Sequence, residues 1–174
     1  MKHSIRKMVT LALCTSIALI LAYVESLIPP LVVAIPGVKL GLPNIAIIFI
    51  LYQFGMSEAI VVSIVRVFAV SLLFGNPVTL AYSAAGAILS LVGMALLKRT
   101  NWLSTVGVSV AGGVLHNVGQ ILVAMLLLGT AELGYSLIVL TLTGIISGIF
   151  VGFCAAFAIK RINVKKISKN NIIL

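Results

Sequence analysis

Six apolar segments dominate this chain, and they determine which solvent most of its surface can face. Charged residues or turns rich in glycine and proline bound them, and they run over Met8–Ser26, Leu40–Phe54, Ser57–Phe74, Pro77–Leu97, Trp102–Leu128 and Tyr135–Ile159. A helix needs about 20 apolar residues to cross a bilayer, and five segments come near or exceed that length. Charged residues make up 9% of the chain, against about a quarter in soluble domains. The sequence therefore predicts an all-α integral membrane protein with a six-helix transmembrane bundle.

The second segment is too short to span the bilayer. From Asn44 to Phe54 a helix rises about 16 Å, about half of a hydrocarbon core. The preceding stretch, Leu27–Pro43, cannot form a long helix because it contains four prolines. Its part Leu31–Ile35 is nevertheless too apolar for a water-facing loop. We expect a short second helix and a proline-rich outer loop over a cavity; a loop lying passively among the lipid headgroups is the alternative.

The basic residues set the predicted orientation. With the N-terminus inside, ten of the twelve basic residues fall in cytoplasmic pieces, namely residues 1–7, the loop Lys98–Asn101 and the tail from Lys160. This N-in/C-in arrangement satisfies the positive-inside rule. Such flanking charges contact anionic lipid headgroups, and without interleaved aromatic residues they do not indicate nucleic-acid binding. We expect one domain over residues 1–174, with membrane helices at about 8–161 and a basic cytoplasmic tail at 162–174.

The carboxylates are too few and too scattered for most enzyme chemistry. The chain has no aspartate, and its glutamates, Glu25, Glu58 and Glu132, lie at separate segment ends. Phosphoryl transfer and prenyl-diphosphate chemistry need clustered carboxylates that hold Mg²⁺. The sequence also lacks a phosphate-binding loop and metal-ligand spacing, and Cys14 and Cys154 are far apart in apolar runs. We therefore predict a protein that is not an enzyme and has no cofactor.

Polar side chains inside the predicted helices are the candidate binding groups. Arg66 lies about 14 Å from the cytoplasmic end of its segment, where a charge is costly unless it faces the interior or a cavity. It could bind an anion or hold backbone carbonyls. His116, Asn117 and Gln120 fall within one and a half turns, and either ligand binding or helix–helix hydrogen bonding explains them. Tyr82 could face a cavity from the outer half of the fourth segment.

Small residues recur every four positions on two segments. The sixth carries Gly144, Gly148 and Gly152, a face that predicts close helix packing. The first carries the pairs Ala12 with Ser16 and Ala18 with Ala22. These could dock another membrane subunit or pack within the bundle.

Three sequence stretches resemble the Gx transporter family, which is often labelled heptaprenyl diphosphate synthase component I. They are Pro36–Asn44, the helix from Val65 to Gly75, and the run His116–Gln120. The resemblance extends from about Met8 to Arg161. The family in turn resembles the S components of energy-coupling factor (ECF) transporters. Those are six-helix proteins that capture a vitamin-like substrate outside and associate with a membrane T component and two cytoplasmic ATPases.

The resemblance implies roles for particular regions of this chain. The first outer loop would gate the site, and substrate contacts would come from that loop and the last three helices. An Ala-x3-Ala motif on the first helix of S components serves for docking, and the nearest matches are the partner-docking candidates Ala12, Ser16, Ala18 and Ala22. The candidate substrate-binding residues are Lys39, Asn44, Arg66, Tyr82, His116, Asn117 and Gln120.

The leading hypothesis is the substrate-binding subunit of an ECF-type importer in a bacterial cell membrane. Its substrate would be small and anionic or amphiphilic, because Lys39, Arg66 and His116 supply positive or potentially positive charge. A noncatalytic accessory protein for isoprenoid or quinone biosynthesis is the second hypothesis, and a self-contained channel or carrier built from homo-oligomers is the third.

The orientation gives the first testable prediction. Reporter fusions after Lys7, Arg99 and Lys166 should read cytoplasmic, whereas fusions near Lys39 and Glu132 should read external, because the basic residues remain inside. Green fluorescent protein fluorescence reports a cytoplasmic fusion, and alkaline phosphatase activity reports an external one. An external C-terminal tail would contradict the six-helix arrangement.

Overall fold

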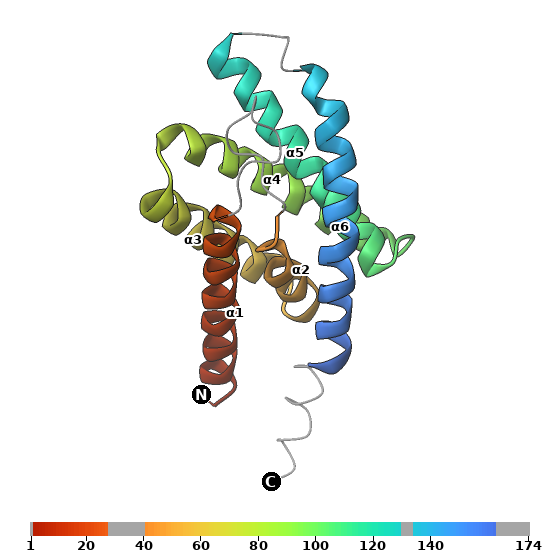
Figure 1. The fold of residues 1–174 in the computed structure, drawn as a ribbon. Coiled ribbons are helices and arrows are strands. Elements are labelled where there is room, and N and C mark those ends of the chain that lie inside the picture. The colour runs from red at the N-terminus through yellow and green to blue at the C-terminus, as the bar shows by residue number, and fades with distance from the viewer. Residues whose placement is uncertain (1, 28–40, 130–133, 163–174) are drawn as a thin grey trace.

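The computed structural model describes residues 2–27, 41–129 and 134–162, and within them every regular element is a helix. The helices are α1 (Lys2–Ser26), α2 (Asn44–Gln53), α3 (Met56–Phe74), α4 (Pro77–Thr100), α5 (Thr105–Leu128) and α6 (Ser136–Arg161). All except α2 are long and apolar enough to cross a membrane. The six predicted helices, including the short second one, are confirmed. The first turn of α1 and the last turn of α6 lie at the same end of the molecule (Figure 1), as the predicted N-in/C-in topology requires.

Two boundaries differ from the sequence prediction. Helix α1 begins at Lys2, six residues before the predicted Met8. Helix α4 runs to Thr100, so Lys98 and Arg99 occupy its last turn and not a loop. Basic side chains are favourable there because the helix dipole is negative at its C-terminus. Asn101, with φ of 57°, then ends the helix in the left-handed conformation.

Local sequence fixes where α4 and α5 begin. The Asn76 side chain accepts a hydrogen bond from the Thr79 amide at 2.8 Å, and Pro77 occupies the first turn, where it displaces no helical hydrogen bond. Ser104 caps α5 in the same way, because its hydroxyl accepts from the Gly107 amide at 3.2 Å.

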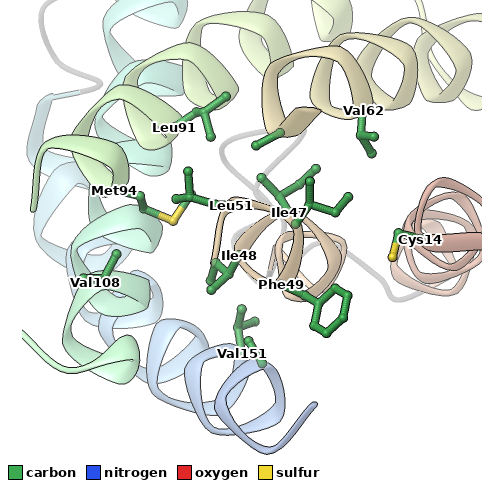
Figure 2. Packing of buried hydrophobic residues seen from close by; sticks show 13 residues of the cluster. Cys14, Ile47, Ile48, Phe49, Leu51, Val62, Leu91, Met94, Val108 and Val151 are labelled. Atoms are coloured by element: carbon green, nitrogen blue, oxygen red, sulfur yellow. The ribbon is translucent and has the colours of Figure 1, made fainter. Parts of the chain in front are cut away.

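Helix α2 lies at the centre of the bundle. Its residues Ile47, Ile48, Ile50 and Leu51 are at most 2% exposed. Side chains from all five other helices surround it, as Figure 2 shows for Cys14, Val62, Leu91, Met94, Val108 and Val151. A helix that is apolar on every side is stable only when it is enclosed. The short second segment is therefore a core element.

Side chains from neighbouring helices anchor the C-terminal end of α2. The Lys98 ammonium donates a hydrogen bond to the Leu51 carbonyl and lies 4.9 Å from the centre of the Tyr52 ring. Gln53 donates to the Ile162 carbonyl at 3.1 Å, just beyond the end of α6. These bonds satisfy backbone groups that helix ends leave without partners.

Glycines bring the backbones of α5 and α6 into direct contact. A Cβ added at Gly148 would lie 2.6 Å from the Val110 Cα, and one at Gly152 would lie 2.8 Å from the Val106 Cα. The opposite side of α6 exposes Phe150, Phe153 and Phe157, as a lipid-facing surface does. The predicted packing role of the Gly144, Gly148 and Gly152 face is confirmed.

Substituting Gly148 tests this contact. Gly148→Ala should destabilise the protein by about 1–3 kcal/mol, because its new methyl group meets backbone that cannot rotate away. At about 2–4 °C per kcal/mol for a chain of this size, the melting temperature in detergent should fall measurably. Gly134→Ala is the control, because among the described residues the nearest atom to its Cβ is a Met125 side-chain carbon at 3.9 Å. Equal melting temperatures for the two variants would show that the α5–α6 contact is looser than these short distances indicate.

Candidate functional site

A polar cavity lies where α1, α3, α4 and α5 meet. Its volume is about 30 Å³, and its polar lining residues are Glu25, Arg66, Ser83 and His116. Ala22, Val67 and Val70, together with Pro43 just before α2, complete the wall. A space of this volume holds one or two water molecules. The cavity is thus small and gathers charged and polar side chains from four helices.

Arg66 belongs to the inward face of α3. The buried residues of this helix recur at spacings of three and four, and they are Ala59, Val62, Ser63, Arg66, Val67, Val70 and Ser71. The guanidinium is therefore carried into the interior with the apolar stripe, and the side chain is 7% exposed. Its Nη1 donates to the Asn44 amide oxygen at 3.0 Å. This bond joins α3 to the first residue of α2.

Glu25 is the residue that sequence reasoning missed. It lies near the end of the first segment and is not among the candidate binding residues, yet it is buried on the cavity wall. Its carboxylate accepts a hydrogen bond from the Gly41 amide and attracts the Arg66 guanidinium electrostatically. The signal was present in the helical spacing of the buried residues Cys14, Ala18, Ala22 and Glu25.

The polar residues of α5 point in different directions. His116 lines the cavity. Asn117 instead donates to the Leu140 carbonyl of α6 at 2.6 Å. Gln120 packs on α4, where a Cβ added at Gly86 would lie 3.0 Å from its Cγ. His116 meets the same glycine of α4 through its ring, at 3.0 Å from that Cβ position, and of the three residues it alone is among those that line the cavity.

Of the two remaining candidates, Tyr82 lies within the described residues and Lys39 does not. Tyr82 is buried on α4 but is not among the residues that line the cavity, whereas Ser83 beside it is. Lys39 lies outside the described residues, as does most of the proline-rich loop.

The docking candidates on α1 divide between two faces. Ala18 and Ala22 are buried and face the bundle. Ala12 and Ser16 are exposed on the outside of the helix. Of the two small-residue pairs, only the Ala12 and Ser16 pair is therefore accessible to another membrane subunit.

The donor set of the site favours charge recognition over metal chemistry. No group of three or more histidine, cysteine, aspartate or glutamate side chains that could hold a metal ion occurs within the described part of the chain. Cys14 and Cys154 are both free thiols. What the cavity offers is a guanidinium, a carboxylate, an imidazole and a hydroxyl at close quarters. Such groups bind anionic or hydrogen-bonding ligands.

Five long apolar helices around a buried short helix define a multi-pass helical membrane protein with a charged interior cavity. The chain belongs to the family described as heptaprenyl diphosphate synthase component I, whose sequence profile matches residues 14–158. The family expected under that label is thus confirmed. No curated protein and no solved structure matches the chain.

A double-mutant cycle tests the pairing of Glu25 with Arg66. Glu25→Gln and Arg66→Met should each lower the stability of the protein, because each removes one of two buried charges that attract each other. The double variant should lose less than the sum, with a coupling of about 0.5–3 kcal/mol. The melting temperatures of the unmodified protein, the two single variants and the double variant, all in detergent, give the coupling.

The exposed pair of Lys7 and Glu58 is the control for this cycle. Glu58→Gln should change the melting temperature little, since water screens an ion pair at the surface. Additive effects of Glu25→Gln and Arg66→Met would contradict the pairing.

Proposed function

We propose that this protein is the substrate-binding (S) subunit of an ECF-type importer in a bacterial cell membrane. The observation that carries the proposal is the buried Arg66, held by Asn44 and opposed by Glu25 on the wall of an interior cavity. Ionisable residues within a membrane are costly and generally mark substrate or ion pathways. The predicted T component and two ATPases would supply the energy.

The charge arrangement favours a small substrate with an anionic group. Arg66 has five N–H donors, and Asn44 accepts from one of its nitrogens. An incoming carboxylate or phosphate would bind the guanidinium and compete with Glu25 for it. His116 would add a hydrogen bond from the opposite wall, and its positive charge when protonated. The substrate is thus anionic or amphiphilic, as the sequence hypothesis holds.

Substrate entry requires the cavity to widen. Drug-sized ligands occupy pockets of about 300–1,000 Å³, and this cavity has about 30 Å³. Glycine-mediated backbone contacts join α4, α5 and α6, whereas α1 and α3 meet the cavity through side chains such as Ala22, Glu25 and Val70. We propose that α1 and α3 move outward when substrate binds.

A noncatalytic accessory role in isoprenoid or quinone biosynthesis is the second candidate. The family's description, which names a component of heptaprenyl diphosphate synthase, favours it. A catalytic role is disfavoured because the chain has no aspartate and three glutamates, which is too few for a typical Mg²⁺-carboxylate site. Purification with native partners separates the candidates: a T component with ATPases supports the importer, and a prenyl synthase supports the accessory role.

Substitutions on α5 test the binding site. His116→Ala should weaken substrate binding about tenfold to a hundredfold, the effect of losing one hydrogen bond to a charged group, while the yield of folded protein stays near normal. Asn117→Leu is the control, because it removes the bond to the Leu140 carbonyl of α6 and should lower stability without changing affinity per folded molecule. Uptake by cells and thermal melting of the purified protein measure the two effects.

The opposite pattern would assign His116 to the framework of the bundle. That is, His116→Ala would prevent folding and Asn117→Leu would abolish uptake by stable protein. The binding site would then lie elsewhere.

A further inference from the structure

A second polar space lies next to Asn44, on the side of α5 and α6. Its volume is about 10 Å³. Three polar side chains line it, Asn44 of α2, Ser109 of α5 and Ser147 of α6, and Met94 of α4 also borders it. Gly112, Gly113, Gly148 and Val151 form the rest of its α5 and α6 walls. Asn44 therefore contacts Arg66 in one direction and borders this space in another.

Ser109 gives this space its chemical character. The residue is 2% exposed, and its hydroxyl oxygen makes no hydrogen bond to any described residue. It cannot shift sideways easily, because α6 packs against it at Gly152, where an added Cβ would lie 2.9 Å from the Ser109 Cβ. Buried hydroxyl groups are normally hydrogen-bonded to protein or to ordered water. A buried hydroxyl on the wall of a small cavity thus indicates a partner that occupies the cavity.

We propose that this space is a binding site for one water molecule held by Asn44, Ser109 and Ser147. A cavity of at least about 10–15 Å³ can hold one water, and the water needs two to four polar partners. The volume is at the lower end of that range, and the number of polar side chains fits. The space has no room for a larger ligand.

The hydrogen-bonding capacities of the three side chains complement a water molecule. The Asn44 amide oxygen accepts from Arg66, so its NH₂ group is the part left to donate to water. The Ser147 hydroxyl donates to the Gly144 carbonyl at 3.4 Å, and its lone pairs can accept from water. The Ser109 hydroxyl can donate or accept. The water thus receives one bond, gives one, and forms a third with Ser109.

The water would also orient the amide that holds Arg66. When the Asn44 NH₂ group donates to the water, its oxygen must face the guanidinium. Polar groups on α5 and α6 are then linked through one water and one amide to the charged cavity between α1 and α3. This inference does not depend on the identity of the transported substrate.

Ser109→Ala tests the proposal through the sign of its effect on melting temperature. If the hydroxyl binds water, its removal leaves the water with one partner fewer, and the melting temperature should fall by about 2–4 °C. Ser90→Ala is the matched control. Ser90 is equally buried at 2%, its hydroxyl also bonds no described residue, and it is not among the residues lining the space.

The control variant should not lower the melting temperature, because Ser90 does not line the space and its hydroxyl is not part of the proposed water site. A rise of similar size in both variants would overturn the proposal. That result would mean that the Ser109 hydroxyl has no partner and the space is dry.

An experimental structure at about 2 Å resolution, in detergent or lipid nanodiscs, shows directly whether a water occupies the space. We expect density for one water within hydrogen-bond distance of the Ser109 hydroxyl and the Asn44 amide nitrogen. A space without density overturns the proposal whatever the thermal data show. So does a Ser109 hydroxyl rotated to bond the Thr105 carbonyl of its own helix, the usual alternative for a buried serine in a helix.

Discussion

Ten residues of α2 rise only about 15 Å, so this helix cannot present both ends to water across a hydrocarbon core of about 30 Å. Its backbone groups must find partners within the protein. The Lys98 ammonium supplies one for the Leu51 carbonyl, and the turn before the helix supplies others, with the Asn44 amide donating to the Gly41 carbonyl at 2.9 Å. The bundle is arranged around this requirement, because all five longer helices contribute side chains to the cluster that encloses α2.

The charged cavity follows from the same enclosure. Asn44 is the first residue of α2, so the helix that fills the core also brings an amide to Arg66. Glu25 then binds the Gly41 amide just before the helix and attracts the guanidinium. An isolated buried charge would be strongly destabilising, but a paired and hydrogen-bonded one is tolerated. Core packing and the candidate binding site are thus linked through Asn44, the first residue of the core helix.

Helical periodicity made much of this fold predictable from the sequence. The length and apolarity of the segments indicated six helices and the short second one, and the glycine spacing on α6 indicated a packing face. The position of a residue along its segment was a poorer guide to whether its side chain is buried. Glu25 was assigned by its place near a segment end, although the stripe of Cys14, Ala18 and Ala22 carries it inward. Which neighbour His116, Asn117 and Gln120 each face depends on helix packing, and one sequence does not encode that locally.

The central position of α2 has a consequence for how the protein is made. Translation produces α2 before α4, α5 and α6, yet Val108 of α5 and Val151 and Ala155 of α6 belong to the cluster around it. Its final environment therefore cannot exist until nearly the whole chain has left the ribosome. As a helix of ten residues it is also too short to insert as an independent span. The nascent chain must keep α2 sheltered between α1 and α3, by the insertion machinery or by its own helices, until the last helix enters the membrane.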